Sequence, residues 1–171
     1  PLQVLTQPQL VVCVTSPEPI RGRVVLGTEF RFIRCKRAAL FGLTSHWVEK
    51  GQRVVVSDVE RTILDGLKQP EHCGGVTEVA KGLWMRRADV DPGRLVDYAS
   101  RLGVGAVTRR LGYLMEAFGV GAPGHLARMR RSLTPTYHLL DPLLPAEGRF
   151  LARWRLRLNV SPEEIQAAVR S

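Results

Sequence analysis

Long apolar runs and paired cysteines are missing from this chain of 171 residues. No apolar run reaches the ~18 residues that a membrane-spanning helix needs, so we expect no membrane partner. The longest N-terminal apolar run, Leu10 to Val14, is too short for a signal peptide and follows no basic segment. The cysteines, Cys13, Cys35 and Cys73, are scattered and form no CxxC pair. We therefore expect reduced thiols in a cytoplasmic protein.

Lysine is also scarce, although the chain is basic. It supplies only Lys36, Lys50, Lys68 and Lys81 among 25 Lys and Arg residues, and the net charge is +9. A surface rich in arginine suits bidentate contacts to phosphate or carboxylate. We therefore expect an acidic partner, either nucleic acid or an acidic protein. A GC-rich genome that encodes Arg in place of Lys is the alternative explanation of the Arg/Lys ratio.

The hydrophobic pattern changes along the chain, which has the length of about one domain. Short β-branched runs such as those at 10–14 and 53–57, separated by turn residues, predict strands over residues 10–56. We expect a turn around Gly27. "RWRLRLN" near the end alternates strictly, which predicts a half-buried strand with Trp154, Leu156 and Leu158 inside and Arg153, Arg155 and Arg157 outside.

Helical spacing begins after Ser57. We expect Ser57 and Glu60 to form a capping box in which each side chain bonds the other residue's N–H. Arg61 and Asp65 are placed to pair on the outer side of this helix, and Pro70 ends it. Further helices are predicted from Val76 after a Gly74-Gly75 turn, from an Asp91 N-cap, over 105–118, over 125–131 and from Ser161. The predicted fold is α+β: a β-rich N-terminal part, a central helical layer and C-terminal strands returning to the sheet.

No motif indicates catalysis. Asp58, Glu60 and Asp65 would suit a metal-dependent nuclease, but the capping box and the Arg61 pair already use two of these carboxylates. His72 and Cys73 lack further ligands at zinc-site spacing, and no activating partner for a Cys73 nucleophile is visible. No GxxxxGK[ST] motif occurs. We expect no catalytic residue, no metal and no cofactor, with a divergent nuclease or a stand-alone nucleic-acid-binding module as the alternatives.

The basic residues are the better candidates for a binding surface. Residues 86–131 contain nine basic and four acidic residues, and arginines beside an aromatic residue can hold phosphates and stack on bases. An ordinary solvated helix face is the competing interpretation for any single arginine. The predicted DNA- or toxin-contacting residues are Arg109, Arg110, Tyr113, Arg128, Arg130, Arg131, Arg153, Arg155 and Arg157.

Several segments in fixed order resemble a known family. They are "VSDVERTILDGL" (56–67), "CGGVTEVAKGL" (73–83), "LVDYASRLGVGAVTRRLGYLMEAFG" (95–119), and then "LLDP" and "RWRLRLN". Together they resemble the C-terminal domain of the AbiE-type (AbiEi) abortive-infection antitoxins of type IV toxin–antitoxin systems, which are also described as transcriptional regulators of viral defence.

The resemblance implies a function as well as a fold. The family's C-terminal domain opposes a nucleotidyltransferase-like toxin, and an N-terminal winged helix-turn-helix binds the operator. Residues 1–56 read as strands rather than a helix-turn-helix. We therefore expect residues 1–171 to be a single antitoxin-like C-terminal domain, with operator binding requiring the N-terminal domain that this chain lacks.

Overall fold

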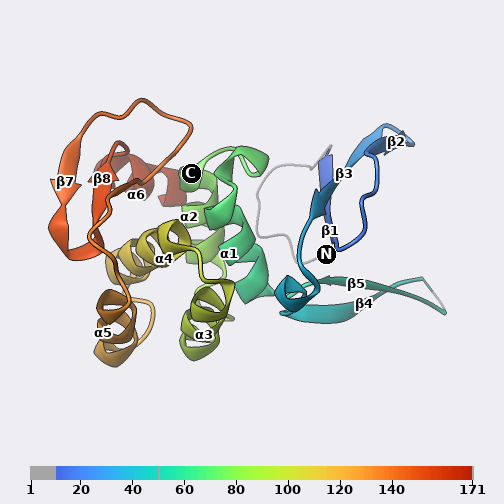
Figure 1. Cartoon of the computed structure of the whole chain (residues 1–171), viewed down its shortest axis with the longest axis horizontal. Coiled ribbons are helices and arrows are strands. Elements are labelled where there is room, and N and C mark those ends of the chain that lie inside the picture. The colour runs from blue at the N-terminus through green and yellow to red at the C-terminus, as the bar shows by residue number, and fades with distance from the viewer. Residues whose placement is uncertain (1–10, 50, 171) are drawn as a thin grey trace.

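The computed structural model describes residues 11–49 and 51–170. Strands occupy the N-terminal part, helices the middle, and a small sheet with a final helix the C-terminal part (Figure 1). This arrangement confirms the predicted α+β class.

The N-terminal strands form two separate small sheets. In the first, β1 (Val11–Ser16) runs parallel to β3 (Thr28–Arg34), and β2 (Arg23–Val25) pairs with β3 in the antiparallel sense. The turn from β2 to β3 passes through Leu26 and Gly27, both at positive φ. This is the turn that the sequence predicts.

The second sheet is a hairpin of β4 (Leu43–Glu49) and β5 (Gln52–Ser57), which follows the short 3-10 helix η1 (Arg37–Ala39). The hairpin extends away from the helices (Figure 1). Most of its side chains are exposed, Trp47 and Val55 among them.

The helical layer matches the predicted helices closely. None of its helices, within the part of the chain that the structure describes, combines the length and apolar character needed to cross a bilayer. The elements are α1 (Val59–Lys68), the 3-10 helix η2 (Pro70–His72), α2 (Val76–Met85), α3 (Pro92–Leu102), α4 (Gly105–Phe118) and α5 (Pro123–Arg131).

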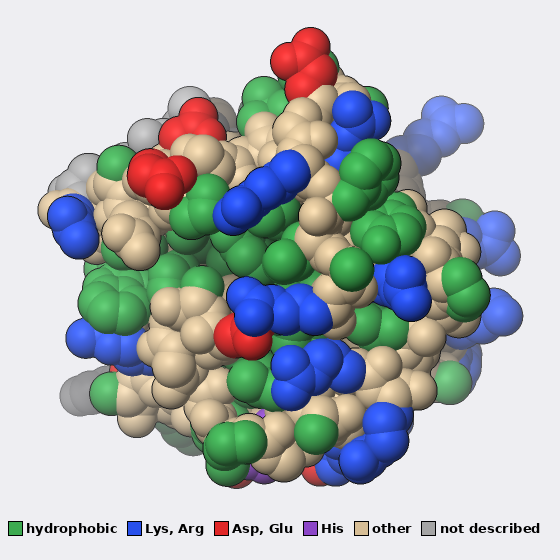
Figure 2. Space-filling model, turned by 90° about the vertical axis from the view of Figure 1, so that its left-hand side faces the viewer, with side chains coloured by type: hydrophobic (Ala, Val, Ile, Leu, Met, Phe, Trp, Pro, Cys, Tyr) green, Lys and Arg blue, Asp and Glu red, His purple; other side chains and the backbone are tan. Residues whose placement is uncertain are grey.

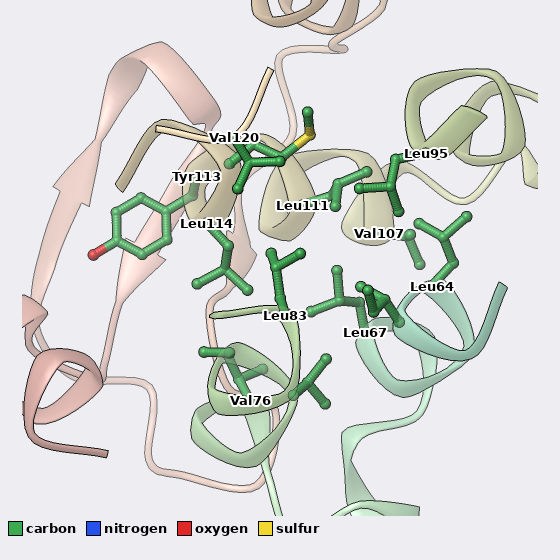
Figure 3. Packing of buried hydrophobic residues seen from close by; sticks show 14 of the residues in the cluster. Leu64, Leu67, Val76, Leu83, Leu95, Val107, Leu111, Tyr113, Leu114 and Val120 are labelled. Carbon is green, nitrogen blue, oxygen red and sulfur yellow. The ribbon is translucent and has the colours of Figure 1, made fainter. Parts of the chain in front are cut away.

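The core lies where α1, α2 and α4 meet. Leu64 and Leu67 from α1, Leu83 from α2 and Leu111 from α4 are fully buried and converge on one centre (Figure 3). Burial of each such side chain contributes roughly 1.5–3 kcal/mol before the entropy of ordering it is subtracted. The apolar periodicity of these helices is therefore what assembles the layer.

Among the residues that the structure describes, the C-terminal strands pair with one another in a separate small sheet. β6 (His138–Leu139) runs parallel to the central β8 (Leu156–Leu158), and β7 (Arg149–Leu151) is antiparallel to it. The last helix, α6 (Pro162–Arg170), packs on α2. The predicted return of these strands to the first sheet is therefore wrong, because alternation specifies a face and not a partner strand.

The strand predicted over "RWRLRLN" is shorter than expected. Trp154 lies in a 3-10 turn, η3 (Ala152–Trp154), and Arg155 follows at φ 50° in the left-handed region, so the strand begins only at Leu156. The Trp154 indole packs so closely on α4 that a Cβ added to Gly112 would lie 2.1 Å from it. The chain thus turns to bury the indole, and Trp154, Leu156 and Leu158 are inside as predicted.

Candidate partner-binding surface

The cap of α1 differs from the predicted one. Asp58, not Ser57, is the N-cap: its Oδ1 accepts the Arg61 N–H at 2.8 Å, and its Oδ2 accepts the Tyr98 hydroxyl at 3.1 Å. Ser57 is the last residue of β5. The predicted capping box is therefore wrong, because the strand extends one residue further than the serine cap would allow.

Glu60 joins two helices instead of closing that box. Its side chain is buried, accepts the Asp91 N–H at 2.8 Å, and lies 3.5 Å from the Arg94 guanidinium. Glu60 thus fixes the start of α3 against α1.

The predicted Arg61–Asp65 pair is present, at 2.9 Å, but Arg61 is buried rather than on the outer side. Its guanidinium donates to the carbonyls of Ala39 and Phe41 and lies over the Phe41 ring. Arg61 therefore ties the N-terminal β part to the helical layer.

These contacts give the acidic residues at the N-cap of α1 and within it structural roles. Asp58, Glu60 and Asp65 are each engaged in structural contacts, and the described residues contain no group of three or more His, Cys, Asp or Glu side chains placed to share a metal ion. Burial, with the nearby Cys13 and acidic side chains, raises the pKa of the Cys73 thiol to about 11. A thiol of that pKa is protonated at neutral pH and is a poor nucleophile.

The Gly74-Gly75 turn is built for the start of α2. Both glycines have positive φ. The buried Asp141 carboxylate accepts the Val76 N–H at 2.8 Å and the Leu143 N–H at 2.9 Å. A carboxylate at the first turn complements the helix dipole. Sequence reasoning did not identify this role of Asp141, which lies 65 residues away from Val76.

Arg109, Arg110 and Tyr113 do not lie on an exposed basic face. Arg109 is 1% and Arg110 5% exposed, and Tyr113 is also buried. Arg109 donates to the carbonyls of Gly105 and Thr134, and Arg110 donates to those of Leu67 and Leu139. The predicted exposure of these three residues is wrong, because the two guanidinium groups donate to carbonyls inside the fold and the Tyr113 ring packs in the hydrophobic core.

The arginines of α5 and η3 are exposed. Arg128 pairs with Asp97, and Arg131 is exposed at the end of α5. Arg153 and Arg130 approach the carboxylate of Glu116 at 3.1 and 3.9 Å, and that carboxylate also accepts the Trp154 indole N–H. One partly buried carboxylate thus balances two guanidinium groups.

Arg155 and Arg157 lie at the C-terminal sheet beside aromatic rings. Arg155 lies over the ring of Tyr137, 5.6 Å from its centroid, and Arg157 lies over the ring of Phe150 at 5.2 Å. Tyr137 and Phe150 touch edge to face. Neither aromatic residue was predicted as a site residue, and the adjacent apolar residues of "RFL" give no alternation that would mark Phe150 as outward-facing.

These side chains define what we call the C-terminal arginine surface. Arg149 is included because it is exposed in β7 and directly precedes Phe150. Figure 2 views this side of the molecule, where Lys and Arg side chains alternate with apolar ones. The members are Arg130, Tyr137, Arg149, Phe150, Arg153, Arg155 and Arg157.

Comparison with known proteins adds no relative. No family model matches the chain, and no curated protein or solved structure is similar to it.

Proposed function

We propose that this chain is a non-enzymatic antitoxin domain of the cytoplasm that opposes a nucleotidyltransferase-like toxin. Its resemblance to the AbiE-type antitoxins supports the family. The residues that carry the resemblance have coherent roles, since "VERTILDGL" forms α1 and "RRLGYL" lies in the buried α4. Those motifs specify the core, so the contact residues must be sought elsewhere.

The observation that carries the proposal is the C-terminal arginine surface. The guanidinium groups of Arg130 and Arg153 share one carboxylate, that of Glu116. A guanidinium has five N–H donors, and the hydrogen bonds of Arg155 to the Tyr137 hydroxyl and of Arg157 to the Gly148 carbonyl use one donor each. The surface therefore fits an acidic partner, and such complementarity acts mainly on the association rate.

The separate engagement of Asp58, Glu60 and Asp65 supports a binding role over the nuclease alternative. Asp58 caps α1 and Glu60 anchors α3. Moving either carboxylate to a metal would break those contacts.

Weak contact with DNA phosphates is a second candidate function of the same surface, favoured by the exposed Arg149 and Arg153. Each phosphate contact would add about 0.9 to the salt slope of duplex binding. Operator recognition itself would depend on a winged helix-turn-helix of the kind that the resemblance implies.

Growth rescue tests the proposal. The chain would be co-expressed with the toxin encoded by the neighbouring gene, as wild type and as the double variant Arg155→Glu/Arg157→Glu. The matched control is Arg21→Glu/Arg34→Glu, which changes the charge equally at exposed positions of the N-terminal part. We expect wild type and the control to rescue growth and the C-terminal variant to fail; equal rescue by all three would refute the assignment of this surface, and no rescue by any of them would refute the antitoxin function.

A further inference from the structure

The C-terminal arginine surface contains an aromatic pair between two cations. Tyr137, just before β6, and Phe150 of β7 have ring centroids 5.1 Å apart, with ring planes at 84°. Arg155 lies over the first ring and Arg157 over the second. We call these four side chains the aromatic platform.

The strand register places the platform on the outer face of the sheet. Phe150 is opposite Arg157, whereas Leu151 is opposite Leu156 one residue further along. Neighbouring positions in a strand point to opposite faces, and Leu156 is fully buried. Phe150 and Arg157 therefore point away from the core.

Folding does not account for the exposed ring. Phe150 is 62% exposed and is not part of the hydrophobic core. A cation–π contact at so exposed a site contributes only about 0.5–1 kcal/mol. Two rings in contact, each with a guanidinium over it, instead combine the aromatic and cationic groups that hold single-stranded nucleic acid.

We propose that the aromatic platform binds single-stranded nucleic acid. An unpaired base stacks on the exposed Phe150 ring, and Arg155 and Arg157 bind the adjoining phosphates. A duplex hides the faces of its bases, so the platform favours single strands over duplex. This inference rests on the proposed function only in taking the C-terminal arginine surface as a contact surface.

The test uses the full chain and a short fluorescent oligonucleotide of mixed sequence, as a single strand and as its duplex. Affinity would be measured by anisotropy from low to moderate salt. We expect tighter binding of the single strand. Phe150→Leu, which keeps an apolar side chain but removes the aromatic face, should weaken single-strand binding by about 5- to 150-fold, the worth of one base–aromatic stack, with little effect on the duplex.

Two further variants separate stacking from charge. Arg157→Gln should lower the salt slope of single-strand binding by about 0.7, whereas Phe150→Leu should leave the slope unchanged. Trp47→Leu is the matched control, because Trp47 is an exposed aromatic residue with Arg53 over its ring, located on the distant β4–β5 hairpin. It should bind as wild type does.

Equal affinity for single strand and duplex, or wild-type binding by Phe150→Leu, would overturn the inference. So would a loss of binding in Trp47→Leu as large as that in Phe150→Leu. If the oligonucleotide does not bind while toxin neutralisation still depends on Arg155 and Arg157, the inference fails and the proposed function stands. If Phe150→Leu loses the single strand but neither the wild type nor any variant neutralises the toxin, the inference stands and the proposed function fails.

Discussion

Nη1 of Arg110 donates a hydrogen bond of 2.7 Å to the carbonyl oxygen of Leu67, in the last turn of α1. The same guanidinium donates to the carbonyl of Leu139 in β6. A cation at a helix C-terminus complements the dipole and satisfies carbonyls that the helix leaves open. Arg110 thus connects α4, α1 and the C-terminal sheet.

Replacing Arg110 should therefore destabilise the fold. We expect Arg110→Met to lower the free energy of unfolding by about 3 kcal/mol, because buried carbonyls lose charged donors. Urea denaturation measures this, with the exposed Arg131→Met expected to stay within about 0.5 kcal/mol of wild type. If Arg110→Met left the free energy of unfolding unchanged, the prediction would be wrong, and water would replace the guanidinium at no cost in stability.

The cap of α1 gives a second prediction. Asp58→Ala should cost about 1–2 kcal/mol, because it removes the N-cap and the acceptor of the Tyr98 hydroxyl. Ser57→Ala should have almost no effect, since Ser57 ends β5. If urea denaturation showed a larger loss of stability for Ser57→Ala than for Asp58→Ala, the serine capping box would be the correct description of this cap.

Gly112 and Gly124 offer a matched pair of helical glycines. Gly112→Ala would force a methyl group into the Trp154 ring, and overpacking of this kind should cost about 3 kcal/mol. Gly124→Ala on α5 meets nothing within 4 Å and should stabilise by about 0.5 kcal/mol through helix propensity. Thermal melting of both variants checks the packing, and a stable Gly112→Ala protein would contradict it.

Stability should fall on mild acidification through His138. Burial, together with the charges of Arg109 and Arg110, lowers the pKa of His138 below its ordinary value of 6.5. The unfolded chain therefore binds the proton more readily than the folded one, so stability is greatest above the ordinary pKa and declines as pH falls toward the folded pKa.

Urea denaturation between about pH 7 and pH 5 measures this dependence. His138→Gln should flatten it, and His46→Gln, at an exposed position of β4, controls for loss of a histidine. If the free energy of unfolding of His138→Gln fell with pH as steeply as that of wild type, His138 would not be the source of the pH dependence.

The helical layer was predictable because its apolar residues recur at helical spacing. The predicted helix over 105–118 is α4, and the Asp91 cap and the Ser161 start were also correct. The pattern could not show that Arg109 and Arg110 point inward. Their acceptors include Leu67, 43 residues away, and Leu139, 29 residues away, and local spacing contains no information about such distant carbonyls.

The candidate surface was predictable only in part. Arg153, Arg155 and Arg157 were identified from alternation and are solvent-accessible. Tyr137 and Phe150 meet only because both flank β8. Strand register brings them together, and the sequence does not specify that register.

The affinity of the purified toxin for this chain tests the central claim most directly. Binding would be measured for wild type, Arg155→Glu/Arg157→Glu and the control Arg21→Glu/Arg34→Glu, at low and moderate salt. We predict that Arg155→Glu/Arg157→Glu weakens toxin binding at least about tenfold, chiefly by slowing association. The difference in affinity between this variant and wild type should narrow as salt screens the charges. Equal affinity of all three proteins for the toxin would contradict the account.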